Sequence, residues 1–228
     1  MKKTITKSHL ALALILGSIW GFSEVILGVG LRTCAHLVSG SLMTGVALFF
    51  IATTWVVTRN YLAPVLVVLI AAVFKLFDAV LLSLPVMHGA IGNPIFAFLM
   101  EGLAFIVLIA ILRNVLWKKT SSRALLGAGS ALVAVALFPL VKFATGVPAC
   151  VYPNTLVPLS IFFAPVAIAF SAFTVPLGFL AGERIEASLD HIGLQIKSAF
   201  LRTMVSPITL ALCLALVLLF RMIVVSDF

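Results

Sequence analysis

The sequence contains little charge. Lys, Arg, Asp and Glu together make up 10% of its 228 residues, whereas 63% are hydrophobic, and the mean hydropathy is +1.29. This composition excludes a soluble domain of this size. The apolar segments are about 20 residues long, as membrane-spanning helices require, and not the alternating segments of about 10 residues that build a membrane β-barrel.

Common catalytic motifs are also missing. The sequence contains no G-x-S-x-G, H-E-x-x-H or Walker loop. The last apolar segment has no central Lys, which excludes the Schiff base of a light-driven pump. We therefore expect no enzyme and no resident cofactor, although Glu24 or Asp78 together with His36 has the groups for acid–base chemistry.

Neither a leader peptide nor a nucleic-acid-binding patch is predicted. The basic start MKKTITK is followed by GSIWGFSEVILG, which has no small-residue cleavage site and continues as membrane helix, so we expect the first apolar segment to be retained. The net charge is +8, but the cations are distributed over the loops. This pattern indicates membrane topology, and we expect no nucleic-acid partner.

The apolar segments predict an all-α, polytopic transmembrane helix bundle of six to seven spans. We divide it into a six-span substrate-binding bundle (1–182), an amphipathic helix on the cytoplasmic membrane surface (183–203) and a seventh span (204–228). Pro139, Pro158, Pro165 and Pro176 predict kinks or interruptions in spans five and six. The predicted spans are 9–31, 36–58, 61–82, 94–112, 124–145, 156–181 and 204–225.

The loops predict the orientation. Lys and Arg accumulate in the loops that share a side with the N-terminus, whereas the other side has Arg32 and the terminal Arg221. Positively charged loops remain in the cytoplasm. We therefore expect an integral protein of a prokaryotic cytoplasmic (inner) membrane, with its N-terminus inside and its C-terminus outside.

Five ionisable residues lie within the spans at one predicted depth. With a rise of about 1.5 Å per residue, all fall in the outer half of the bundle: Glu24, Lys75, Asp78, Glu101 and Lys142. Charges inside a membrane usually mark binding sites or pathways. We interpret them as an outward-facing polar pocket; the alternative is that Glu24 or Glu101 pairs with Lys75 or Lys142 to fix the helix register.

Polar residues in the external loops extend this predicted pocket. The loops contain Pro and Gly at positions typical of short, stiff turns. Further candidate substrate ligands in or beside these loops are Arg32, His36, His88, Asn93, Tyr152 and Asn154.

The same loops contain a candidate metal site. Cys34, His36, His88 and Cys150 are residue types that bind soft metals, which makes a metal ion or metal chelate a candidate cargo. Cys34 and Cys150 could instead form a disulfide in an oxidising compartment.

Small residues repeat along the first span. Ala13, Gly17 and Gly21 recur every fourth residue, which allows another helix to approach closely. That helix could belong to the bundle or to another membrane protein.

With these features the chain resembles the substrate-binding (S) components of energy-coupling factor transporters, the vitamin and metal importers of prokaryotes. The shared features are the basic start with its small-residue stripe, the external polar residues, and the external loops around His36, His88 and Cys150. Over residues 7–182 the resemblance implies a six-span fold whose stripe meets a transmembrane coupling subunit driven by ATPases. A seventh span, and Gly17 and Gly21 in place of Ala, depart from the family pattern.

We therefore predict a solute-capture subunit of a multi-component importer. Its acidic and basic residues together suit a small polar or zwitterionic solute, with a vitamin or a metal species as candidates. The alternatives are a stand-alone proton-coupled secondary transporter, an integral-membrane enzyme and a structural subunit of a larger complex. No inverted repeat supports the secondary transporter.

Overall fold

The computed structural model describes residues 7–35, 38–112, 119–191 and 204–226. Within these ranges the backbone is helical apart from turns and one isolated bridge between Val151 and Pro158. The helices are α1 (Lys7–Ala35), α2 (Ser39–Thr58), α3 (Leu62–Leu81), α4 (Gly89–Leu112), α5 (Thr120–Leu137), η1 (Phe138–Leu140), α6 (Val141–Thr145), α7 (Leu159–Phe162), α8 (Ala164–His191) and α10 (Ser206–Ser226).

The predicted all-α bundle is confirmed. Seven helical segments among the described residues are long and apolar enough to cross a membrane. They match the seven predicted spans, and the largest differences lie at the start of α4 and the end of α8. α4 begins at Gly89, because the His88 carbonyl accepts hydrogen bonds from the N–H groups of Ile91 and Gly92 upstream of Pro94. α8 continues through residues 183–191 without a break, whereas 192–203, the rest of the predicted surface helix, lie outside the described residues.

Prolines interrupt the fifth and sixth spans, as predicted. Pro139 lies in η1, where α5 changes to a 3₁₀ turn before α6. Pro158 precedes α7, and Pro165 lies in the first turn of α8. Pro176 lies inside α8, which remains one helix. The interruptions lie at the end of the bundle opposite to the start of α1, where they leave room for irregular backbone.

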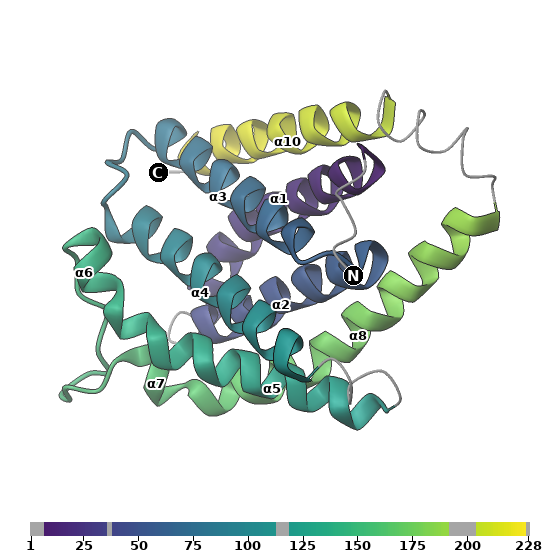
Figure 1. Ribbon diagram of the computed structural model, residues 1–228. Coiled ribbons are helices and arrows are strands. Elements are labelled where there is room, and N and C mark those ends of the chain that lie inside the picture. The colour runs from purple at the N-terminus through teal and green to yellow at the C-terminus, as the bar shows by residue number, and fades with distance from the viewer. Residues whose placement is uncertain (1–6, 36–37, 113–118, 192–203, 227–228) are drawn as a thin grey trace.

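α2 lies in the middle of the bundle (Figure 1) and packs closely against α8. A Cβ atom at position 178 would lie 2.6 Å from the Phe49 carbonyl oxygen, so glycine at this position permits the approach. Two hydroxyls cross the same interface: Thr174 Oγ1 donates to the Gly45 carbonyl (2.7 Å) and Thr53 Oγ1 to the Gly178 carbonyl (3.1 Å). In lipid, such small residues and interhelical hydrogen bonds replace the hydrophobic effect as the source of helix association.

The small-residue stripe on α1 lies against α3. Ala13 is fully buried. A Cβ atom at Gly17 would lie 2.8 Å from the Ile70 side chain, and one at Gly21 would lie 2.5 Å from the Phe74 ring. The stripe is therefore covered by a helix of the same chain in this structure. Its role in docking a partner stays a prediction.

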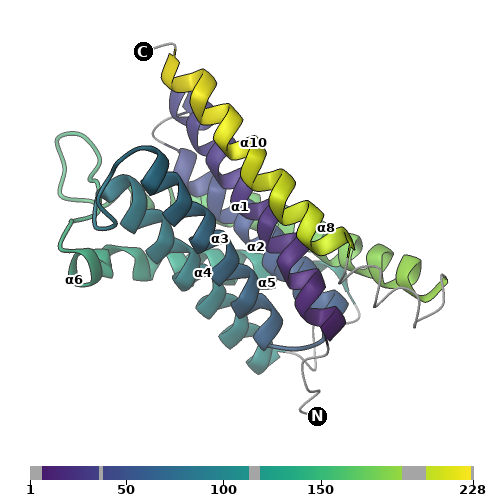
Figure 2. The ribbon, with the colours of Figure 1, turned by 90° about the horizontal axis from the view of Figure 1, so that it is seen from above.

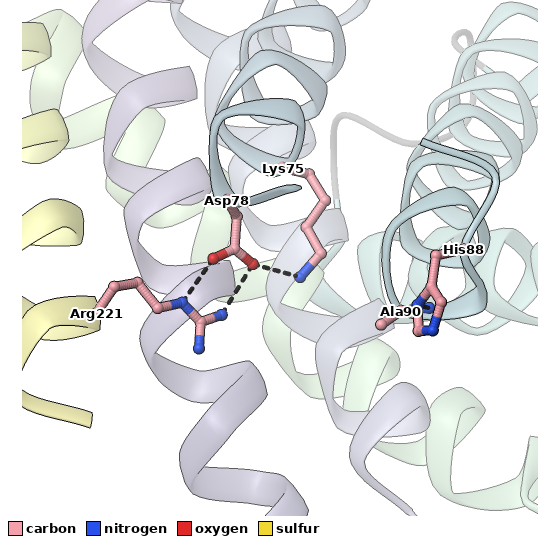
Figure 3. Close-up of polar contacts among 5 residues, drawn as sticks. All are labelled: Lys75, Asp78, His88, Ala90 and Arg221. Carbon is pink, nitrogen blue, oxygen red and sulfur yellow. Dashed lines mark hydrogen bonds and ion pairs between the residues drawn. The ribbon is translucent and has the colours of Figure 1, made fainter. Parts of the chain in front are cut away.

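α10 lies along the outside of α1 and α3 (Figure 2). It is mostly exposed, and a charge cluster fixes it near its C-terminal end. Arg221 donates to both oxygens of Asp78 on α3, with Nε–Oδ1 and Nη2–Oδ2 distances of 2.6 and 2.9 Å. Lys75 Nζ lies 3.2 Å from the same Oδ2 (Figure 3). Asp78 is fully buried, so two cations from two helices compensate one carboxylate.

Two ion pairs join helices at the opposite end of the bundle. Arg123 at the start of α5 contacts Glu183 on α8, with an N–O distance of 2.6 Å. Arg59 after α2 contacts Glu186, at 3.4 Å. Both pairs are partly exposed, as expected for groups near the membrane surface. They hold α2 and α5 to the last turns of α8.

Gly127→Ala should destabilise the protein. An added Cβ would overlap the Ser171 carbonyl oxygen on α8, and overpacking of this kind costs about 1–3 kcal/mol. The matched control is Gly30→Ala on α1, where no atom lies within 4 Å of the added Cβ and the higher helix propensity of alanine should be neutral or stabilising. Thermal unfolding in detergent compares the two variants. Equal melting temperatures would contradict the close approach of α5 and α8.

Arg221→Gln should destabilise the protein more than Arg59→Gln. Removing one partner of a buried ion pair costs about 3–5 kcal/mol. Lys75 remains beside Asp78 and should offset part of this loss of stability. The Arg59 pair is a third exposed and should contribute about 0–1 kcal/mol. The free energy of unfolding of each variant, together with protease cleavage of α10, measures the difference. Similar losses in both variants would show that Arg221 does not anchor α10.

Candidate ligand-binding site

A cavity of about 290 Å³ lies at the end of the bundle opposite to the start of α1. It is bounded by the second half of α1, the first turns of α2 and α4, the end of α5, η1 and α7. Small-molecule pockets in proteins have volumes of about 300–1,000 Å³, so this cavity lies just below that range and suits a small solute. Its described lining residues are Glu24, Gly28, Ser39, Gly40, Ser41, Met43, Thr44, Gly89, Asn93, Pro94, Ala97, Phe98, Glu101, Ala134, Val135, Phe138, Cys150, Leu159 and Ser160.

Two carboxyl groups form the deep part of the cavity. Glu101 comes from α4 and Glu24 from α1; their residues are 3% and 6% exposed. The groups are near enough to repel each other when both are ionised, and the Thr44 side chain of α2 lies against the Glu101 carboxyl. Three helices therefore meet at this acidic floor.

Several polar atoms in the cavity wall have unused hydrogen-bonding capacity. Glu101 Oε2, Asn93 Oδ1 and Ser160 Oγ are buried and have no hydrogen-bond partner among the described residues. Native proteins rarely leave buried polar atoms in this state, and each case calls for an explanation such as a bound ligand or water. All three residues line this same cavity.

Apolar side chains close the cavity below. Phe98 lies in its wall and packs against the buried Trp20, with ring centroids 5.0 Å apart. Trp20 also stacks on Phe50 at 6.5 Å. Leu16, Ile51 and Phe105 of the main hydrophobic core lie deeper along α1, α2 and α4 than the lining residues of these helices. The core therefore closes the cavity on the side away from the loops after α1, α3 and α6.

The loop between α6 and α7 forms one edge of the cavity. Cys150 lies on this edge, and its carbonyl accepts a hydrogen bond from the Leu159 N–H (2.8 Å). Tyr152 stacks on Phe162, with ring centroids 3.8 Å apart. Asn154 lies at the exposed tip in the left-handed region, with φ 61°. Tyr152 and Asn154 thus shape the loop and do not line the cavity.

The residues predicted for one pocket fall into separate groups. Glu24, Asn93 and Glu101 line the cavity. Lys75 and Asp78 have the same predicted depth but pair with each other, and Asp78 also pairs with Arg221 of α10. The alternative that Glu101 pairs with Lys75 or Lys142 is not among the ion pairs of the described residues. The same alternative for Glu24, and the role of each predicted ligand in binding, stay predictions.

Two further predicted ligands lie outside the cavity lining. His88 is exposed at the start of α4, where its Nδ1 accepts a hydrogen bond from the Ala90 N–H (3.2 Å, Figure 3). Lys142 is exposed on α6, with its ammonium group 4.8 Å from the centroid of the Phe143 ring. His88 caps a helix, and Lys142 covers an aromatic face.

The candidate metal set is only partly described. His36 and the side chains of Arg32 and Cys34 lie outside the described residues, so the predicted disulfide between Cys34 and Cys150 stays a prediction. Of the other two metal candidates, Cys150 lines the cavity and His88 does not. The described residues contain no group of three or more His, Cys, Asp or Glu side chains able to hold a metal ion.

Sequence reasoning missed the hydroxyl and aromatic residues of the site. Ser41, Thr44, Ser160, Phe98 and Phe138 line the cavity, but none of them is charged. A signal for part of the site was present in the sequence: Asn93, Ala97 and Glu101 recur every fourth residue, which places them on one face of a helix.

Comparisons with protein-family models, with curated proteins and with solved structures gave no match to this chain.

Proposed function

We propose that this protein is a solute-capture subunit of a multi-component membrane importer, and that the cavity is its binding site. The observation that carries the proposal is the buried Glu101 carboxyl, which lines a cavity open at one end of a membrane-embedded bundle. Ionisable groups within membrane proteins typically face a cavity and mark the path of a solute. The concave, largely apolar wall with few polar groups is typical of small-molecule sites.

The closed floor favours capture over a channel. Core residues such as Leu16, Ile51 and Phe105 separate the cavity from the other end of the bundle, so a bound solute needs a rearrangement to leave on that side. In the energy-coupling factor importers that the sequence resembles, a coupling subunit and ATPases move the loaded subunit. We propose the same arrangement for this chain, with a binding role and no catalysis.

The distribution of charge supports an outward-facing cavity. Arg59 and Arg123 lie at the end of the bundle opposite to the cavity. Basic residues near membrane-spanning segments favour the cytoplasmic side. We propose a prokaryotic cytoplasmic membrane with the N-terminus inside, so that the cavity receives solute from outside the cell.

A stand-alone proton-coupled secondary transporter is the second candidate. The observation in its favour is the pair of neighbouring carboxyl groups, Glu24 and Glu101, inside the cavity. Intramembrane carboxylates carry protons in many pumps and transporters. The two candidates differ in whether the chain moves solute without other proteins.

Gentle purification from native membranes tests the main proposal. We expect a membrane partner and an ATPase to co-purify with the chain, as measured by native mass spectrometry. Liposomes that contain the chain alone should bind solute from a metabolite extract of the same cells without accumulating it. Accumulation driven by a proton gradient would favour the secondary transporter, and absence of binding would contradict both.

Cysteine labelling tests the orientation. In a Cys34→Ser background, Cys150 at the cavity edge should react with a membrane-impermeant maleimide on intact cells, because that edge is exposed. The matched control combines Cys150→Ser with Ser121→Cys at the start of α5, which lies at the other end and should react only after permeabilisation. The reverse result would place the cavity on the cytoplasmic side.

A further inference from the structure

The described part of the cavity lining is acidic. It contains two carboxyl groups and no Lys, Arg or His. Of the described cations predicted at the depth of Glu101, Lys75 is paired with Asp78, and Lys142 is exposed on α6, outside the cavity lining. Glu101 is 3% exposed, and its Oε2 has no hydrogen-bond partner in the described part of the chain. Leaving a buried carboxylate without a counter-charge costs several kcal/mol.

We propose that the cavity binds a small organic cation whose charged nitrogen lies against the Glu101 carboxyl. This inference rests on the proposed function, because it assumes that the cavity is a solute site. A protonated amine or a related N–H cation supplies the donor that Glu101 Oε2 lacks. Charge-assisted hydrogen bonds of this type are about twice as strong as neutral ones.

The walls fit an organic molecule better than a bare metal ion. Phe98, Phe138 and Met43 present apolar and aromatic surface, and aromatic faces attract organic cations. Asn93 Oδ1 and Ser160 Oγ offer two further buried polar contacts for the rest of the molecule. No group of three or more metal-binding side chains occurs in the described ranges.

The helix N-termini at the cavity mouth do not reverse the preference of the cavity for a cation. α2 and α4 both begin there, and the partial positive charge of a helix N-terminus favours anions within about the first turn only. Glu101 lies well inside α4, about 18 Å from Gly89 along the helix axis at about 1.5 Å per residue. The electrostatic potential at the floor of the cavity is therefore set by the carboxyl groups. The mouth can accept an end of the same solute that is neutral or carries hydrogen-bond acceptors.

The charge of the bound solute is the first test. Full-length protein is purified gently from native membranes, and released small molecules are identified by mass spectrometry for the wild type, Glu101→Gln and the control Glu186→Gln. Glu186 is a partly exposed carboxylate at the other end of the bundle. We expect a stoichiometric organic cation in the wild type and the control, and at least a tenfold loss in Glu101→Gln.

Each other result has a distinct meaning. A neutral or anionic solute in the wild type would overturn the cation inference and leave solute capture intact. A cation retained equally by Glu101→Gln would overturn the assigned role of Glu101. An empty wild-type protein would contradict the proposed function itself. Because the wild type alone reports the charge of the solute, the test holds even where Glu101→Gln fails to fold.

A defined pair of probes gives a second measurement. Phenethylammonium and 2-phenylethanol are similar in size and differ in charge. Phenethylammonium should raise the melting temperature of the wild type and of Glu186→Gln, but not that of Glu101→Gln, whereas 2-phenylethanol should raise none of them. Equal stabilisation by both compounds, or stabilisation by neither, would count against a cation site.

Discussion

The inability of lipid to solvate an ion is the constraint on which this structure depends. Each charge carried into the membrane needs a partner or a cavity. Asp78 has two partners, since Arg221 and Lys75 bind it from α10 and from one turn earlier on α3. Glu101 instead faces a cavity. One arrangement fixes the outermost helix, and the other leaves a group that can interact with a solute.

The geometry of the cavity follows from how closely the helices pack elsewhere. Glycine at position 178 and the Thr174 hydroxyl hold α2 against α8, which fixes the first turns of α2 beside α4. Ser41 in those turns lines the cavity and also donates to the Phe163 carbonyl at the break between α7 and α8 (3.1 Å). The break between α7 and α8, beside Pro165, thus lies where this hydrogen bond joins α2 to the sixth span. Tight packing in one half and irregular backbone in the other produce a cavity closed at its floor.

Hydropathy and proline positions predicted the helices, but not the separation of the charges. Seven apolar segments and the interruption at Pro139 can be read from local sequence, because both depend on neighbouring residues alone. The rise along a helix gives only an approximate depth: Asp78 lies one turn from the end of α3, whereas Glu101 lies about three turns inside α4. Depth does not give the direction in which a side chain points, which depends on the neighbouring helices. Arg221, interpreted from sequence as a terminal loop charge, therefore went unrecognised as the partner of Asp78.

The charge balance of the cavity bears on how a captured solute could move. An ionised Glu101 in an empty cavity is an uncompensated charge in a low-dielectric region. A bound cation neutralises it, so the loaded bundle carries less net charge through any rearrangement than the empty one with Glu101 ionised. A proton on Glu101 has the same effect. In a subunit that is tilted by a partner, this equivalence favours movement of the loaded or protonated form, and in a lone transporter it would couple the solute to the proton. The carboxyl group thus serves both candidate mechanisms, and what separates them is the source of the energy that moves the bundle.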